Sequence, residues 1–88
     1  MDENAKVLEM IRNGCVDIRY EDLRSLCESY FGFPRQSGSS HAVFRMPWSG
    51  DPRIDIQRDK NGKAKKYQIR QVLKAIDRLH EEGERSPS

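Results

Sequence analysis

The sequence predicts one small α+β domain, in which helices cover one face of a three-stranded antiparallel sheet in the order helix–helix–strand–strand–strand–helix. Three observations carry this prediction. The first third of the chain has two stretches with apolar residues at helical spacing. Two short stretches in the middle alternate apolar and polar residues, as half-buried strands do. A long amphipathic stretch then covers residues 67–82 and predicts a third helix.

The two N-terminal helices are expected over residues 3–13 and 21–31. Each is followed by a glycine, Gly14 and Gly32, and Pro34 prevents the second helix from continuing. The apolar residues that we expect in a common core with the sheet are Val7, Leu8, Ile11, Leu23, Leu26, Cys27, Tyr30, Phe31, Phe33, Ile69, Val72, Leu73, Ile76 and Leu79.

The strands are expected over residues 35–37, 41–46 and 53–57, the first as a short edge strand. Successive side chains of a strand point to opposite faces, so the apolar residues of the second and third strands should face the helices. This apolar set is Ala42, Phe44, Met46, Ile54 and Ile56. The opposite face can stay solvated, and it should hold His41, Val43, Arg45, Arg53, Asp55 and Gln57.

Positive charge is concentrated in the middle of the chain, although the net charge of the 88 residues is only +2. Residues 34–74 hold ten lysines and arginines against three aspartates, whereas the segments before and after them are acidic. The basic residues around the start of the last helix are Lys60, Lys63, Lys65, Lys66 and Arg70. Helix N-termini attract anions through their unpaired N–H groups. The pattern therefore predicts a phosphate-binding surface, with a solvated lysine-rich loop as the alternative.

One histidine, His41, opens the second predicted strand and lies on its solvated face. Because histidine titrates near neutral pH, His41 is a candidate general base, with an ordinary surface position as the alternative. Asp55 on the partner strand either orients His41 or forms an ion pair with a neighbouring arginine, and we favour the ion pair. The other histidine, His80, lies among glutamates at the end of the last helix, and we expect no catalytic role for it.

Two aromatic residues lie at the borders of predicted elements. Trp48 follows the second strand, in a turn rich in proline and glycine, and Tyr67 begins the last helix. Either ring could stack on a nucleic-acid base, but packing against the domain is the interpretation that we favour for both.

Composition points away from several classes of protein. Hydrophobic residues make up 35% of the chain, the mean hydropathy is −0.90, and no apolar run approaches the roughly 18 residues of a membrane-spanning helix. No signal-peptide pattern opens the chain. Cys15 and Cys27 fit no metal-binding or redox spacing, so we expect two reduced thiols and a cytoplasmic protein. We expect no cofactor and no metal ion, because no cluster of ligand residues is evident.

Several sequence elements in a fixed order resemble the HicA family of mRNA-interferase toxins. They are the GFPRQSGSSHAVFRMPWSGDPRIDIQ stretch, with its Gly-Ser-Ser-His opening and PWSGDPR turn, and the KNGKAKKYQIRQVLKAI stretch. The resemblance covers residues 23–80. Residues 3–13 are an extra helix compared with the shortest family members, and Gly38 lies three residues before His41, where many members have this glycine two before.

The resemblance implies a fold, an activity and partners. The implied fold is that of double-stranded-RNA-binding domains, whose last helix opens with a similar lysine cluster; it would form one domain over residues 1–83, followed by a disordered tail over 84–88. The implied activity is metal-independent cleavage of mRNA, with His41 as the catalytic residue and Gly38, Ser39 and Ser40 as the loop before it. Arg45 and Arg53 are candidates to stabilise charge on the phosphate. The implied partners are RNA and a HicB-like antitoxin, and no membrane. A non-catalytic RNA-binding module and a protein-interaction adaptor are the alternatives.

Overall fold

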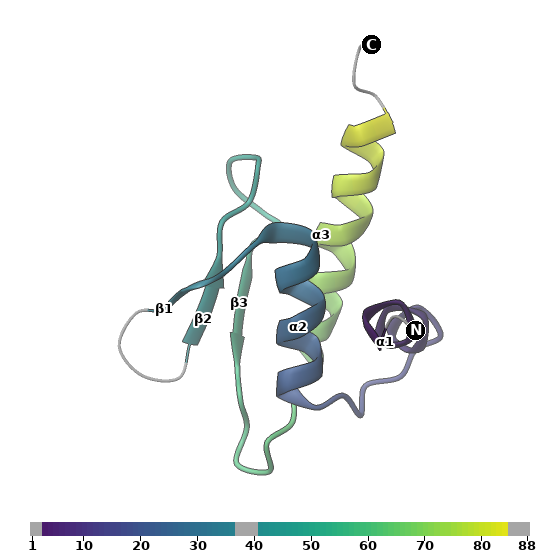
Figure 1. The fold of residues 1–88 in the computed structure, drawn as a ribbon, viewed down its shortest axis with the longest axis vertical. Helices are drawn as coiled ribbons and strands as arrows, with labels where there is room; N and C mark the ends of the chain where they lie inside the picture. Colours follow the sequence, from purple (N-terminus) through teal and green to yellow (C-terminus); the bar gives the residue numbers. More distant parts are fainter. Residues whose placement is uncertain (1–2, 37–40, 85–88) are drawn as a thin grey trace.

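The computed structural model describes residues 3–36 and 41–84. Its helices are α1 (Glu3–Arg12), α2 (Tyr20–Phe31) and α3 (Lys66–Glu84), and its strands are β1 (Arg35–Gln36), β2 (His41–Phe44) and β3 (Ile54–Gln57) (Figure 1). The predicted class, a small α+β domain, is confirmed. The loop Gly38–Ser40, Ser37 of the predicted edge strand and residues 85–88 of the predicted tail lie outside the described residues. The helix α3 extends into that tail as far as Glu84.

An antiparallel pair of four-residue strands forms the main part of the sheet. His41 lies opposite Gln57 and Phe44 lies opposite Ile54, so β2 and β3 are in register over their whole length. The two-residue β1 pairs with the other edge of β2, with Arg35 opposite Val43. The predicted alternation is confirmed along both long strands, because Ala42, Phe44, Ile54 and Ile56 are buried.

The strand β2 ends two residues earlier than predicted. In the register of this pair, Arg45 would face Arg53 and Met46 would face Pro52. Two like charges directly opposite each other destabilise a pair of strands, and proline has no N–H to donate to the ladder. The pairing therefore stops at Phe44, and Arg45 is not carried on the strand face that holds His41.

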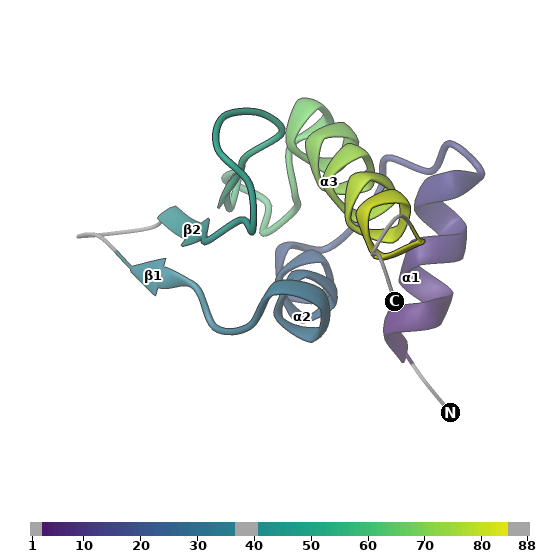
Figure 2. The same cartoon turned by 90° about the horizontal axis from the view of Figure 1, so that it is seen from above.

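The helices lie in two layers on one side of the sheet. The pair α2 and α3 packs against β2 and β3, and α1 packs against α2 and α3 on the side away from the sheet (Figures 1 and 2). The core between these layers is formed mainly by buried aliphatic residues, the largest of which are Leu23, Leu26, Ile54, Ile56, Ile69, Val72 and Ile76. Each of these residues belongs to the core predicted from the sequence.

The prediction that Phe33 belongs to the core is wrong. Phe33 is 89% exposed. The helix α2 ends at Phe31, and Gly32 then adopts a φ of 86°, which redirects the chain toward β1. Phe33 therefore lies outside the apolar stripe of α2 and does not reach the core.

The basic loop between β3 and α3 is attached to the segment that precedes α2. The Ala64 N–H donates to the Ile18 carbonyl at 2.8 Å, and the Tyr20 N–H donates to the Gly62 carbonyl at 3.0 Å. Within the loop, the carboxylate of Asp59 accepts hydrogen bonds from the backbone N–H groups of Lys63 and Asn61, which hold the pKa of Asp59 below its ordinary value. These hydrogen bonds give the loop a defined conformation and attach it to the rest of the domain.

Both cysteines are thiols, as predicted: Cys27 is buried and Cys15 is partly buried. Burial raises the pKa of Cys27 to about 12, so its thiol stays protonated and unreactive. No helix in the described part of the chain is long and apolar enough to cross a membrane.

Candidate active site

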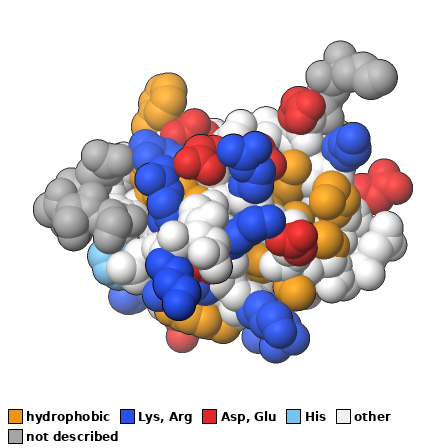
Figure 3. All heavy atoms as spheres, turned by 90° about the horizontal axis from the view of Figure 1, so that it is seen from below, with side chains coloured by type: hydrophobic (Ala, Val, Ile, Leu, Met, Phe, Trp, Pro, Cys, Tyr) orange, Lys and Arg blue, Asp and Glu red, His pale blue; other side chains and the backbone are white. Residues whose placement is uncertain are grey.

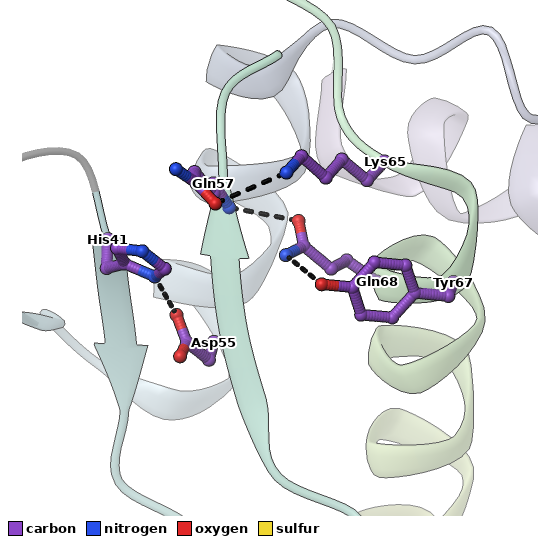
Figure 4. Close-up of polar contacts among 6 residues, drawn as sticks. All are labelled: His41, Asp55, Gln57, Lys65, Tyr67 and Gln68. Carbon is purple, nitrogen blue, oxygen red and sulfur yellow. Dashed lines mark hydrogen bonds and ion pairs between the residues drawn. The ribbon is translucent and has the colours of Figure 1, made fainter.

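The solvated face of the sheet carries a hydrogen-bonded pair, His41 and Asp55. The Nδ1 atom of His41 lies 2.9 Å from Oδ1 of Asp55 (Figure 4). His41 faces Gln57 across the ladder, and Asp55 lies two residues from Gln57 on β3, so the pair is a diagonal contact on one face. Our prediction that Asp55 pairs with an arginine is therefore wrong. The early end of β2 explains this, because Arg45 is not placed beside Asp55 on this face.

The contact with Asp55 selects the tautomer of neutral His41 that can act as a base. An ionised carboxylate can only accept a hydrogen bond. In neutral His41 the proton therefore lies on Nδ1, and Nε2 has the free lone pair.

The pair is accessible to a substrate. The side chains of His41 and Asp55 are 42% and 54% exposed. An ion pair at such exposure contributes only about 0–1 kcal/mol to folding. Stability alone therefore gives little reason to place these two side chains together.

A pocket of about 420 Å³ joins this face of the sheet to α3. Its volume falls within the range of about 300–1,000 Å³ that is usual for small-molecule sites. Its walls include a catalytic candidate pair, three cations and one aromatic ring, namely His41, Asp55, Arg53, Arg70, Lys74 and Tyr67.

The cations of this pocket have no competing carboxylate. Among residues 3–36 and 41–84, Arg53, Arg70 and Lys74 form no ion pair or hydrogen bond through their side chains. Asp55 is the one acidic residue that lines the described pocket, and it contacts His41. The pocket therefore carries an excess of positive charge that suits a phosphodiester.

The structure places the other predicted RNA-binding residues outside this pocket. Lys63 donates to the Asp17 carboxylate at 2.5 Å, and Arg45 lines a separate hollow beside Phe31. The Nζ of Lys65 donates to the side chain of Gln57 at 3.3 Å, and Gln57 lies opposite His41 in the sheet (Figure 4). Figure 3 looks onto the loop end of the molecule, where basic side chains form several separate groups with acidic ones between some of them. Exposed lysines of this region are Lys60 and Lys66.

Sequence reasoning missed much of the α3 wall. The sequence patterns do not predict Lys74 and Gln71 as site residues, and Tyr67, for which we predict packing, is exposed. The available signal was helical spacing: Tyr67, Arg70 and Lys74 follow one another at intervals of three and four residues, which places them on one face of a helix.

The second aromatic candidate, Trp48, packs as predicted. Its Nε1–H donates to the Pro52 carbonyl at 2.8 Å, and its ring lies at 90° to the Phe31 ring, with a centroid distance of 6.2 Å. The Arg78 guanidinium covers the ring at 4.6 Å. His80 meets the Tyr30 ring at 5.6 Å and does not line the pocket.

Comparison with known proteins gives no family assignment: no family model matches the chain, and neither a curated protein nor a solved structure is significantly similar to it. Within the described ranges, no group of three or more histidine, cysteine or acidic residues is arranged to hold a metal ion.

Proposed function

We propose that the protein is a ribonuclease that cleaves mRNA without a metal ion, with His41 as general base. The observation that carries this proposal is the exposed pair of His41 and Asp55, which opens on a pocket lined by cations. RNA cleavage by internal attack requires an oriented base beside positive charge that can bind the scissile phosphate.

RNA supplies its own nucleophile in this reaction. Nε2 of His41 removes the proton of the 2′-hydroxyl beside the scissile phosphate, and the 2′-oxygen attacks phosphorus. The bond to the 5′-oxygen then breaks, which leaves a 2′,3′-cyclic phosphate and a 5′-hydroxyl. Arg53 and Arg70 line the pocket with His41, and we assign to them the stabilisation of the negative charge that develops on the phosphoryl oxygens. No second histidine among the described residues lines the pocket, so we expect the 5′-oxygen to take its proton from solvent and turnover to be slow.

The biological role that we propose is that of the toxin in a HicA-type toxin–antitoxin pair, silenced by a HicB-like antitoxin. The GSSH element and the order of the elements around it support this role. The arrangement of α2, the sheet and α3 also supports a fold like that of double-stranded-RNA-binding domains, with α1 as an addition. The antitoxin would have to cover the solvated face that holds His41.

The proposal is tested by inducing the protein in bacterial cells and following growth and total RNA. We expect growth arrest with fragmentation of mRNA, and relief of both by a co-expressed antitoxin. The purified protein should cut mixed RNA in excess EDTA and leave cyclic-phosphate ends. Binding of RNA without cleavage would instead identify an RNA-binding module, and an absence of salt-sensitive RNA binding would favour a protein adaptor.

Asp55→Asn is expected to lower the rate constant of RNA cleavage by about 10- to 100-fold, which is less than the loss of the base itself. An asparagine amide can donate to Nδ1 and so stabilise the tautomer whose Nε2 carries the proton. The loss should fall on kcat rather than KM. Nitrogen NMR of His41 should show the protonated nitrogen at Nδ1 in the parent and a shifted tautomer balance in the variant. An unchanged kcat would mean that Asp55 does not position His41.

A further inference from the structure

We propose that the pocket binds single-stranded RNA, with one unpaired base stacked on Tyr67 and neighbouring phosphates on Arg70 and Lys74. This inference rests on the proposed function, in which RNA is the ligand. It adds that the RNA is single-stranded and that Tyr67 holds one of its bases. The alternative ligand is duplex RNA held by the basic loop between β3 and α3, and a comparison of the two RNAs in a binding experiment distinguishes them.

Tyr67 is an exposed ring that is held in place. The residue is 63% exposed, although it lies in the first turn of a well-packed helix. Its hydroxyl accepts a hydrogen bond from Nε2 of Gln68 at 3.2 Å, and Oε1 of Gln68 accepts the backbone N–H of Gln57 at 2.9 Å (Figure 4). Gln68 is only 4% exposed and is the single buried polar side chain of the described residues.

This chain of hydrogen bonds joins β3 to the ring across the edge of the pocket. A tyrosine whose hydroxyl is fixed loses little further freedom when a base covers its ring. The ring is also accessible to a ligand, because Tyr67 is exposed and lines the pocket. Stacking on an aromatic ring is how proteins that bind single strands gain affinity for any base.

The cations continue from Tyr67 along the same helix face. Arg70 and Lys74 follow it within about 10 Å of helix axis, and both side chains are exposed. Both line the pocket together with Tyr67 and His41. A strand whose base covers Tyr67 can therefore place its backbone over Arg70 and Lys74 while it remains beside the catalytic candidate.

The basic loop between β3 and α3 offers few free lysines to bind the phosphates of a duplex. Lys63 is engaged by Asp17 and Lys65 by Gln57, so only Lys60 and Lys66 of the loop lysines are left as exposed contacts for phosphates. A base within an A-form duplex is also stacked on its neighbours and cannot reach Tyr67 without being unpaired. Both points favour a single strand over a duplex.

The test uses full-length protein with His41→Ala, so that RNA is not cut during the measurement. Fluorescence anisotropy compares a short, unstructured, labelled RNA with the duplex that it forms with its complement. We expect the single strand to bind about 5- to 100-fold more tightly than the duplex. Adding Tyr67→Ala should remove most of that difference, whereas Tyr67→Phe, which keeps the ring, should retain most of it. Phe33→Ala is the matched control, because Phe33 is an exposed aromatic residue that does not line the pocket.

The phosphate contacts are measured through salt dependence. Arg70→Ala and Lys74→Ala should each lower the log–log salt slope by up to about 0.7 for a single strand. Lys6→Ala, on the helix that packs away from the sheet, should leave the slope unchanged. Equal affinity for duplex and single strand, or unaltered binding after Tyr67→Ala, would overturn the inference. If the parent protein cuts RNA while either result holds, the proposed ribonuclease stands and this binding mode fails. If Tyr67-dependent binding holds without any cleavage, the binding mode stands and the ribonuclease fails.

Discussion

His41→Ala is expected to lower the rate of RNA cleavage by about 10²–10⁴-fold, the usual contribution of a general base. Growth arrest on induction should disappear with it. The reason is geometric: Nε2 of His41 is the free imidazole nitrogen beside the cationic pocket, and no other histidine in the described part of the chain lines that pocket. Cleavage of a labelled RNA by the purified variant, under single-turnover conditions, measures the loss directly.

The same variant should fold normally. His41 is partly exposed and its contact with Asp55 is solvated, so its removal should change the free energy of unfolding by no more than about 1 kcal/mol. Circular dichroism and thermal unfolding check this. His80→Ala is the matched control, because His80 contacts Tyr30 and does not line the pocket. We expect the His80→Ala protein to cleave RNA at the parent rate. A folded His41→Ala protein with full activity would remove His41 from the mechanism.

The elements of the fold were accessible from the sequence because their cues are local. Apolar residues at helical spacing predicted the three helices, and strict alternation predicted which sides of β2 and β3 are buried. Strand ends were less accessible. The end of β2 depends on what lies opposite Arg45 and Met46, and that is known only once the register with β3 is known.

The candidate site divides in the same way. The solvated position of His41 followed from alternation, but its contact with Asp55 is diagonal, and a different register would have separated the two side chains. The engagement of Lys63 is even less local. Its partner Asp17 lies 46 residues earlier in the chain, so composition alone made the lysine loop look more available to phosphates than it is.

A single 2′-deoxy substitution at the cut site is expected to abolish cleavage at that position while other positions in the same RNA are still cut. The proposed mechanism takes its nucleophile from the RNA, and a deoxyribose has no 2′-hydroxyl for His41 to deprotonate. A 2′-methoxy group should block the site equally, because its oxygen carries no proton. Single-turnover cleavage of matched, end-labelled RNAs in excess EDTA gives the measurement.

Binding distinguishes a blocked reaction from a lost complex. The substituted RNA should bind the His41→Ala protein within about threefold of the parent RNA, because the phosphates and bases that supply the affinity are unchanged. Cleavage of the deoxy site at the normal rate would show that the nucleophile is a water molecule rather than the 2′-hydroxyl. Activity that disappeared with EDTA and returned with magnesium would assign Asp55 a different part, since its carboxylate is the acidic group that lines the pocket and would then be the first candidate for a metal ligand.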